Sequence, residues 1–349
     1  MGEPYQRYLV KQAFLTSTHA MDGCETCHKG DPKAAEKSAA HKGLVARPSR
    51  SPDAVCASCH ATEVANVKSS LHFTVRAYEN YLKLVSAQRW TDVQPVFTQA
   101  CQSCHASCGD CHVSKAKSAR GGLMDGHVFS KRPPMENACG TCHGGRVFPE
   151  YTGKNEGFPP DVHWQKAKME CVACHPATQL HGDGTAYPNR HAVKSKPSCL
   201  SCHPNAKAAG SPIEQHAVHG DKINCVVCHS TVYRGCENCH LGAGAKSALQ
   251  FKIGKTAHAG SPYQYTLLRH TPTLRTTLDP KVKDALPNYD AVPTWKDTVP
   301  HNIQRKTART ASCNNCHGNA RIFLKPGDLN PAESAANSKV VVPNIPGRR

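Results

Sequence analysis

The sequence is poor in the side chains that build ordinary protein cores. Of 349 residues, 39% are hydrophobic and 6% are aromatic, which is thin for the two packed domains that this length would suggest. No stretch approaches the roughly 18 consecutive apolar residues of a membrane span. Residues 1–15 lack the apolar core of a signal peptide, as expected of a mature or trimmed chain. The core must therefore be completed by something other than aliphatic side chains.

No cysteine lies outside one pentapeptide motif. All 20 cysteines belong to ten Cys-x-x-Cys-His sequences, so none remains for a disulfide or a catalytic nucleophile. A zinc knuckle, a thioredoxin-like redox pair or a disulfide framework could use CxxC, but none of these requires histidine directly after the second cysteine. Two cysteines at this spacing can form thioethers with the two vinyl groups of one haem, and the adjacent histidine then reaches the iron. We therefore predict ten covalently bound haem c groups.

The predicted haem attachment residues follow directly from the motifs. The thioether cysteines are Cys24, Cys27, Cys56, Cys59, Cys101, Cys104, Cys108, Cys111, Cys139, Cys142, Cys171, Cys174, Cys199, Cys202, Cys225, Cys228, Cys236, Cys239, Cys313 and Cys316. The proximal iron ligands are His28, His60, His105, His112, His143, His175, His203, His229, His240 and His317.

Acidic residues are also scarce. Lys and Arg number 43 against 26 Asp and Glu, giving a formal net charge of +17, which by itself is typical of nucleic-acid or membrane binding. The basic residues are scattered, however, and ten haems would add about twenty propionates and about ten positive iron–porphyrin charges when oxidised. The holoprotein then carries roughly +7 when oxidised and roughly −3 when reduced. We expect the basic side chains to neutralise propionates and expect no nucleic-acid partner.

Twelve histidines lie outside the motifs. Ten haems need ten distal ligands, so the number nearly matches. Methionine competes for this role, but packing explains the four besides Met1 more simply: Met21, Met124, Met135 and Met169. We predict ten low-spin bis-His sites, although chain order leaves open which haem each histidine serves. The predicted distal ligands are His19, His41, His72, His127, His163, His181, His216, His219, His270 and His301, and the surplus or shared histidines are His191 and His258.

Proline and glycine, 25 of each, break the chain into short pieces. The predicted fold is mostly coil with short α-helices and very few strands, a multihaem cytochrome c architecture organised around a chain of haems. The best helix runs from residue 69 to about 89, where apolar residues recur at steps of three and four behind a serine N-cap. We expect this stripe to pack on haem faces or core residues: Leu71, Val75, Tyr78, Leu82 and Val85.

Residues 1–349 are expected to form a single elongated decahaem domain. Residues 241–312 are a haem-poor connecting segment that supplies distal histidines, and residues 326–349 are an extended tail. The β-branched run KVVVPNI at 339–345 could add as a strand to an edge of its own chain or of a neighbour. This tail and residues 5–15 are the candidate clasps between subunits.

Two pairs of motifs have short tethers. Their first cysteines are seven and eleven residues apart in Cys101–His112 and Cys225–His240, and seven residues span at most about 25 Å. These two pairs are therefore predicted to be the closest sequence-adjacent haems.

The motif array resembles that of the bacterial and archaeal multihaem c-type cytochromes, in particular large respiratory and extracellular electron-transfer cytochromes. The similar segments are SLHFTVRAYENYL, SCGDCHVSKAKS, GHVFSKRPP, GKNEGFPPDVHWQKAKMECVACH, QHAVHGDKINCVVCH and PTWKDTVPHNIQRKTARTASCNNCH. The resemblance implies closely spaced haems in stacked and T-shaped pairs, filament formation in some members, and in some a distal histidine supplied by the next subunit. It also implies distal roles for His72, His127, His163, His216, His219 and His301.

The leading functional prediction is an electron conduit rather than an enzyme, because haems with two histidine ligands have no open position for a substrate. It would pass electrons to other redox proteins or extracellular acceptors, outside the cytoplasm: extracellular or at the cell surface, with the periplasm possible. Assembly end to end into a filament and a discrete periplasmic or surface carrier are both left open. The minor alternative is a multihaem nitrite, hydroxylamine or sulfur-oxyanion reductase, which needs at least one open iron position.

Overall fold

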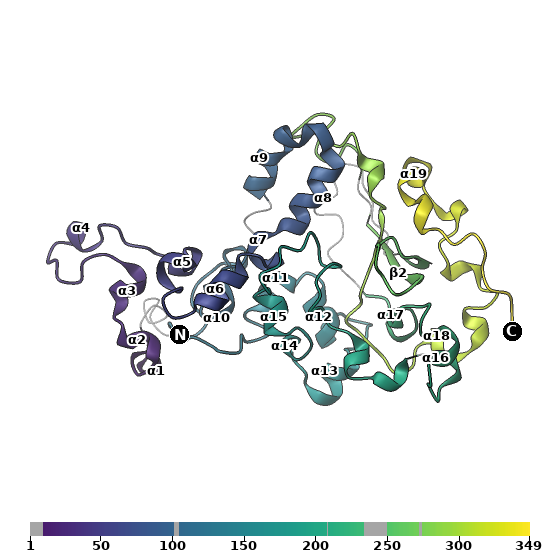
Figure 1. Ribbon diagram of the computed structural model, residues 1–349, viewed down its shortest axis with the longest axis horizontal. Coiled ribbons are helices and arrows are strands. Elements are labelled where there is room, and N and C mark those ends of the chain that lie inside the picture. The colour runs from purple at the N-terminus through teal and green to yellow at the C-terminus, as the bar shows by residue number, and fades with distance from the viewer. Residues whose placement is uncertain (1–9, 101–104, 208, 234–249, 272–273) are drawn as a thin grey trace. The chain divides into compact units, whose positions relative to one another are not determined.

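The fold, seen in a computed structural model, is mostly coil with short helices and one small sheet (Figure 1). The structure describes residues 10–100, 105–207, 209–233, 250–271 and 274–349. The prediction of short helices and very few strands is confirmed. The α-helices are α1 (Gln12–Leu15), α2 (Thr18–Met21), α3 (Cys24–His28), α4 (Lys37–Ala40), α5 (Pro52–Val55), α6 (Ala61–Val67), α7 (Leu71–Thr74), α8 (Arg76–Ser86), α9 (Trp90–Ala100), α10 (Cys108–His112), α11 (Cys139–His143), α12 (Val147–Thr152), α13 (Val162–Ala167), α14 (Cys171–Cys174), α15 (Ala177–Leu180), α16 (Glu214–His219), α17 (Cys225–His229), α18 (Ala308–Ala311) and α19 (Ser334–Asn337).

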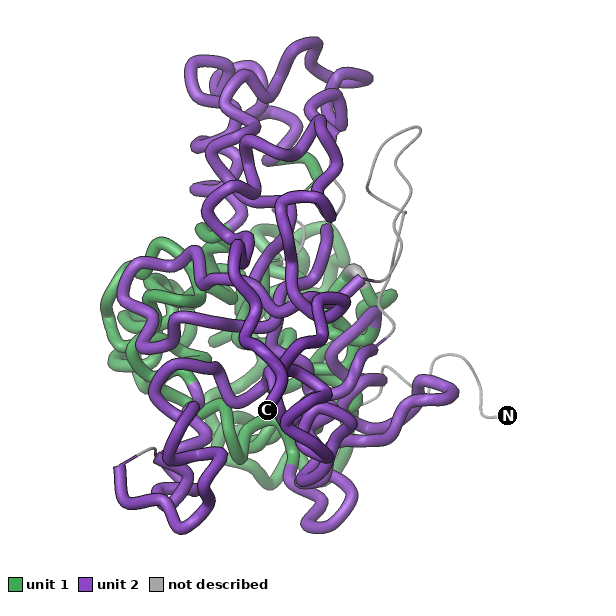
Figure 2. The backbone as a smooth tube through the Cα atoms, turned by 90° about the vertical axis from the view of Figure 1, so that its right-hand side faces the viewer, with its two compact units in different colours: residues 1–77, 98–144, 170–196 green, residues 78–97, 145–169, 197–349 purple. Residues whose placement is uncertain are grey.

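The chain divides into two compact units (Figure 2), where the sequence predicted one domain. Unit 1 comprises Met1–Ala77, Thr98–Gly144 and Glu170–Lys196, and unit 2 comprises Tyr78–Phe97, Gly145–Met169 and Pro197–Arg349. Each unit is thus assembled from three separate stretches of the chain.

The helix predicted over residues 69–89 is interrupted. Ser70 caps α7 by accepting a hydrogen bond from the Phe73 N–H, and the helix ends at Val75, which has a left-handed φ of 46°. This conformation is costly for a β-branched residue and breaks the helical hydrogen bonding. The chain then continues as α8, and the following helix α9 was not predicted.

The apolar stripe of α8 packs as expected, in part. Val85 of α8 and Val93 of α9 are buried against residues 278–292, and Leu82 joins them at the margin. Tyr78, in contrast, is 66% exposed. The stripe therefore forms a small aliphatic and aromatic cluster in unit 2.

A three-stranded antiparallel sheet lies in unit 2, in the order β1 (Phe251–Lys255), β2 (Tyr265–His270) and β3 (Trp295–Asp297). Consecutive residues of β2 point to opposite faces of the sheet, and side chains pack on both of these faces. Leu267 packs with Val226 and Val227 of α17, whereas Leu268 packs with Leu324 and other residues of the C-terminal segment. The CxxCH helix α17 therefore packs on the Leu267 side, whereas the C-terminal segment contributes to both clusters, with Val342 beside Leu267 and Val340 beside Leu268.

The C-terminal segment is a series of short turns and helices rather than the extended tail that the sequence suggested. It comprises η11 (Pro326–Asp328), η12 (Pro331–Glu333), α19 and η13 (Ser338–Val340). Val340 and Val342 are buried, and the Val342 N–H donates to the Leu324 carbonyl at 2.7 Å. The apolar run covers a sheet face on its own chain instead of extending an edge, and Pro343 has no N–H for a ladder. Its role as a clasp between subunits stays a prediction.

Candidate functional site

The described CxxCH motifs lie on short helical turns, which place residues three positions apart on one side. Five of the eight fully described motifs coincide with the helices α3, α10, α11, α14 and α17, and two others begin the 3₁₀ turns η6 (Cys199–Ser201) and η9 (Cys313–Asn315). The eighth, Cys56–His60, forms a turn after α5, in which the His60 N–H donates to the Cys56 carbonyl at 2.8 Å. All described cysteines are free thiols. Each motif therefore offers two thiols and a histidine from one turn, as thioether attachment requires.

Seven motif histidines each face a histidine from outside the motifs. A histidine nitrogen lies about 2 Å from a metal that it ligates, and the ring centre about 1.2 Å further, so two imidazoles on opposite sides of one iron have centres about 6 Å apart. The observed ring-centre distances are 5.9–6.3 Å, for His28–His127, His60–His19, His112–His181, His143–His72, His203–His163, His229–His216 and His317–His219. Each pair lies within one unit.

Hydrogen bonds fix the orientation of several of these rings. Nδ1 lies 2.7–3.2 Å from a backbone oxygen in four motif histidines: His28 (Val45), His112 (Ser130), His229 (Gln304) and His317 (Gly347). A fifth, His175, meets the Gln179 side-chain oxygen at 2.9 Å. A proton on Nδ1 leaves the Nε2 lone pair for a metal, which is the second-shell arrangement of metal-binding histidines.

Five of the seven non-motif partners have a lowered pKa, which favours the neutral imidazole. For His19, His127, His181 and His216, burial lowers the pKa, and the facing motif histidine lowers it further. The pKa of His72 falls to about 4, chiefly by burial and then by repulsion from His143 and His175. A neutral imidazole at pH 7 has a lone pair available for iron.

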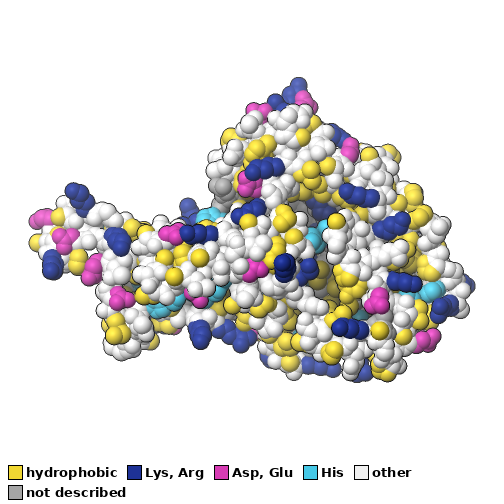
Figure 3. Space-filling view, in the orientation of Figure 1, with side chains coloured by type: hydrophobic (Ala, Val, Ile, Leu, Met, Phe, Trp, Pro, Cys, Tyr) yellow, Lys and Arg dark blue, Asp and Glu magenta, His cyan; other side chains and the backbone are white. Residues whose placement is uncertain are grey.

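The space around these rings is open rather than filled. His72 retains accessible surface although enough protein surrounds it to depress its pKa. In unit 2, a cavity of about 280 Å³ lies against Cys202, His203, Ile213 and His216. Figure 3 shows histidine side chains in such recesses beside apolar side chains, with Lys and Arg dispersed over the surface. The residues present thus fit a flat apolar group with a metal at its centre.

Neighbouring motifs of unit 1 touch through their thiols. Cys56 is hydrogen-bonded to Cys108, which raises the pKa of Cys56 and lowers that of Cys108 to about 7. Cys139 is likewise hydrogen-bonded to Cys171. Burial, followed by repulsion from Cys139, raises the pKa of Cys111 to about 12. Electrostatic repulsion also links Cys27 to Cys56. The motifs that begin at Cys24, Cys56, Cys108, Cys139 and Cys171 are therefore neighbours in a series, joined by two thiol hydrogen bonds and two electrostatic interactions.

Unit 2 has a shorter series of the same kind. Cys225 is hydrogen-bonded to Cys199, which is the main reason that the pKa of Cys225 falls to about 6. Burial and then repulsion from Cys316 raise the pKa of Cys228 to about 11. The motifs that begin at Cys199, Cys225 and Cys313 are therefore neighbours, the first two joined by a thiol hydrogen bond and the last two by an electrostatic interaction.

Other predicted ligands are placed differently. His41 is exposed just after α4, and His105 Nε2 lies 3.0 Å from Arg50 Nη1, with the Phe73 ring against it. Among the described residues, neither ring faces another histidine. The backbone N–H of His301 donates to Glu150, a buried carboxyl whose pKa burial raises to about 7 against the opposing effect of Arg146.

His270 does not join the set of histidine pairs. Its Nε2, the nitrogen needed for iron, lies 2.8 Å from the Glu333 carboxylate, and its ring packs on Trp295. Glu333 also accepts from Thr294 at 2.9 Å, and Asn337 links both residues. His270 thus ties β2 to the C-terminal segment. The sequence did not reveal this contact, because Glu333 lies far from His270 along the chain.

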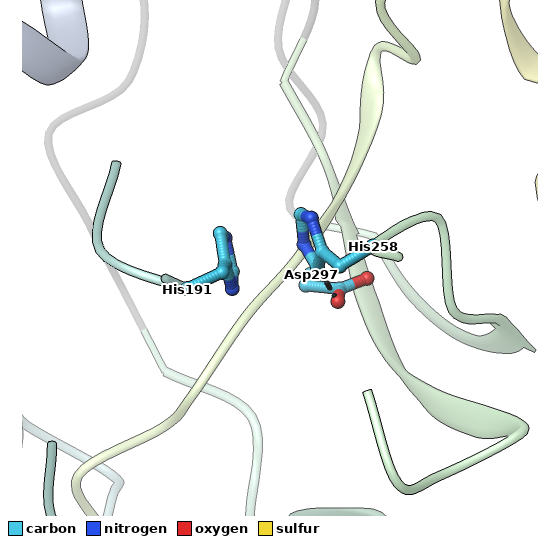
Figure 4. Close-up of side chains that lie close together, drawn as sticks. All are labelled: His191, His258 and Asp297. Carbon is cyan, nitrogen blue, oxygen red and sulfur yellow. Dashed lines mark ion pairs between the residues drawn. The ribbon is translucent and has the colours of Figure 1, made fainter. Parts of the chain in front are cut away.

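The two surplus histidines have local partners. His258 Nε2 lies 2.9 Å from Asp297 Oδ2, as an ion pair across unit 2 (Figure 4). In unit 1, His191 Nε2 accepts from Arg190 Nε at 3.3 Å.

Part of the predicted site lies outside the described residues. This applies to Cys101, Cys104, Cys236, Cys239 and His240, and hence to the two short-tethered pairs predicted to be closest. Among the described motifs, thiol hydrogen bonds join two sequence-adjacent pairs, which begin at Cys139 and Cys171 and at Cys199 and Cys225.

Two side chains that orient candidate ligand histidines were not predicted from the sequence. Asp161 Oδ1 lies 2.8 Å from His163 Nδ1, and Gln179 holds His175. Both residues could have been recognised from the sequence, since Asp161 precedes His163 by two positions and Gln179 follows His175 by four. An acceptor at such short range is the usual partner of a metal-binding histidine.

Comparison of the chain with family models, with curated proteins and with solved structures gave no match. Among the described residues, no helix has the length and apolar character to cross a membrane.

Proposed function

We propose that the protein is an electron conduit that carries ten c-type haems with two histidine ligands each. The observation that carries the proposal is the set of seven pairs of motif and non-motif histidines with ring centres 5.9–6.3 Å apart. No part of an ordinary core requires a motif histidine and a non-motif histidine to meet seven times at this spacing. When bound, haem c supplies a one-electron iron couple.

The paired histidines favour electron transfer over catalysis. Two imidazoles on one iron leave no position for nitrite, hydroxylamine or a sulfur oxyanion, so a reductase would have to use a site outside the seven pairs. The protein's tasks are then to hold each imidazole, exclude water and set the potential. A multihaem reductase remains the minor alternative.

The thiol contacts support an order of sites within each unit. In unit 1 the order is Cys24–His28, Cys56–His60, Cys108–His112, Cys139–His143 and Cys171–His175. In unit 2 it is Cys199–His203, Cys225–His229 and Cys313–His317. Contact between attachment points brings neighbouring porphyrin edges together, as hopping between cofactors needs. Within each unit the described motifs follow chain order, and the motifs Cys101–His105 and Cys236–His240 lie wholly or partly outside the described residues.

Counting haems and their spin states tests the proposal. Denaturing mass spectrometry should show ten haem groups added to the chain, and nine or fewer would contradict the proposed number. Oxidised wild-type protein should show low-spin iron in its optical and EPR spectra. His72→Ala should convert one site in ten to high spin, whereas the matched variant His270→Gln should leave the spectrum unchanged, because His270 faces Glu333. A low-spin His72→Ala protein would contradict the assignment.

Assembly end to end is the finer proposal, with a discrete periplasmic or surface carrier as its alternative. His41 is exposed without a facing imidazole among the described residues, and the half-buried motif histidine His105, whose Nε2 lies 3.0 Å from Arg50 Nη1, has no facing imidazole there either. If His41 of one copy ligated the iron held by His105 of the next copy, the same junction would repeat from copy to copy and form an open filament. Such a conduit works outside the cytoplasm, where extracellular acceptors or other redox proteins receive the electrons.

His41→Ala tests the junction more cleanly than removing residues 326–349, because that deletion would take Val340 and Val342 out of the core. We expect the variant to keep ten haems, to show high-spin iron and to lose filaments in electron micrographs. Filaments of wild-type length with fully low-spin iron would exclude His41 as the shared ligand. A monomeric, fully low-spin wild-type protein would favour the discrete carrier.

A further inference from the structure

The groups that accept a hydrogen bond from the Nδ1 of the described ligand histidines are neutral at every site but one. The acceptors of His28, His112, His229 and His317 are neutral backbone carbonyls, and that of His175 is the neutral Gln179 amide. The distal histidine His219 also meets a backbone carbonyl, that of Gln215. At His163, the non-motif partner of His203, the acceptor is the Asp161 carboxylate. Of these seven Nδ1 acceptors, Asp161 is the one anion.

Asp161 is a fixed and buried part of unit 2. Its side chain is 4% exposed. Oδ1 caps α13 by accepting from the His163 backbone N–H at 2.8 Å and also meets the ring nitrogen at 2.8 Å. Oδ2 accepts from the Ile303 N–H at 2.9 Å, and the Val162 N–H donates back to the Ile303 carbonyl. The carboxylate therefore cannot swing away from the imidazole without breaking the cap.

The charge of Asp161 is not neutralised by a basic side chain. Within the described part of the chain, His163 is its single ion-pair partner. The neighbouring donors are neutral backbone N–H groups, which stabilise the carboxylate without cancelling its charge. The negative charge thus faces the imidazole ring directly.

We propose that Asp161 gives the iron site of His163 and His203 the lowest reduction potential of the three described sites in unit 2. The inference rests on the proposed haem-binding function. A carboxylate that accepts from Nδ1 makes the imidazole a stronger donor at Nε2, and this favours the ferric over the ferrous state. A buried negative charge near the iron favours the ferric state as well, so the two effects have the same sign.

The position of this site in the unit 2 series indicates the direction in which electrons would flow. Its motif touches the next one in unit 2 through Cys199 and Cys225, and there the acceptor of His229 is a neutral carbonyl. An electron on the His163–His203 site therefore moves downhill to its neighbour. This end of the unit 2 series is suited to receive electrons from a donor of low potential.

Asp161→Asn is the direct test, since asparagine retains an oxygen for the cap and for the ring. In a redox titration of the holoprotein followed by optical and EPR spectra, we expect one haem in ten to move from the low-potential end to higher potential. An increase of about tenfold in its ratio of reduced to oxidised iron equals about 59 mV for a one-electron couple. An unchanged titration curve would overturn the proposal.

Gln179→Glu is the reciprocal variant at His175. A carboxylate in place of the amide should lower the potential of one haem by a similar factor, and a shift in the opposite direction or none would count against the mechanism. Haem mass and far-UV circular dichroism establish that each variant is folded and fully loaded. If Asp161→Asn does not fold, Gln179→Glu alone still decides the principle. A wild-type protein without haem would refute the proposed function instead, before either variant is compared.

Discussion

Unit 1 carries six of the ten CxxCH motifs, whereas unit 2 carries four together with the sheet β1–β2–β3. The three hydrophobic clusters of the described residues all belong to unit 2. Unit 1 has buried apolar residues too, such as Val64 and Met135, but they do not form a cluster of that kind in its described part. The two units therefore differ in what fills their interiors.

The difference indicates how folding free energy is divided. Ordering the backbone costs about 1–2 kcal/mol per residue, and burial of apolar surface must offset it. Unit 2 can bury side chains such as Leu267, Leu268 and Trp295 in addition to haem. Unit 1 depends on its histidine pairs and on the porphyrins proposed to lie between them. Under the proposed function, haem would be a cofactor of both units but the main interior of unit 1.

The largest expected effect comes from omitting haem attachment. Protein made without haem maturation should lose unit 1, while unit 2 retains residual structure around its sheet. Hydrogen exchange should show rapid exchange throughout residues 10–77 and measurable protection in β1 and β2, with the holoprotein as the control. Equal protection of both units would contradict the comparison, and a cooperative thermal transition of the whole apo chain would do so as well.

Leu267→Ala should have the next largest effect. The side chain is 1% exposed and packs with Val226 and Val227 of the α17 motif, and such truncations cost about 2–5 kcal/mol. Denaturant unfolding followed by circular dichroism should show the loss in the transition of unit 2. Leu84→Ala, at a position that is 50% exposed, is the matched control and should change stability by less than about 0.5 kcal/mol.

Gly254→Ala should have a smaller effect on the same unit. A Cβ at this position would lie 2.7 Å from the Val340 carbonyl oxygen and would also meet Leu268. Overpacking of this kind costs about 1–3 kcal/mol, and it should increase hydrogen exchange in residues 338–342. At Gly327, a Cβ meets nothing within 4 Å, so Gly327→Ala should be close to neutral. Equal stability of the two variants would show that the C-terminal segment is loosely packed.

The smallest expected effect is the pH dependence of the contact between His270 and Glu333. Burial acts to raise the pKa of Glu333, but hydrogen bonds from His270 and Thr294 outweigh it, so the pKa is lowered. A carboxyl with a lowered folded pKa stabilises the fold fully above its ordinary pKa of about 4.3, and the contribution is lost as pH falls through the folded value. Exchange of α19 should rise in this acidic range, and Glu333→Gln should abolish that rise.

Local chemistry carries the prediction of the attachment sites, and the structure places most of the described motifs on the short turns that this prediction needs. The Cys-x-x-Cys-His motif carries its own geometry, because one helical turn sets the thiols and the histidine without help from distant residues. The sparse secondary structure was equally predictable from proline and glycine. The break at Val75 was not, since nothing in its sequence neighbourhood requires a left-handed φ.

Ligand partners could not be read from chain order. His19 lies just before Cys24 yet faces His60, and His163 passes over His175 to face His203. His270 is held by Glu333 from the C-terminal segment. Sequence distance is a poor guide here because closing a longer loop costs little extra entropy, so packing decides which histidine arrives.

By itself the sequence determined what this protein can bind: twenty thiols and ten adjacent histidines in ten identical local arrangements, with enough further histidines to complete them. Only the tertiary structure decided which of those histidines meet, which motifs touch, and which ligand rests on an anion at Asp161. The physical reason is that attachment is set within one turn of chain, whereas distal ligation and potential depend on contacts between segments that only the folded chain brings together.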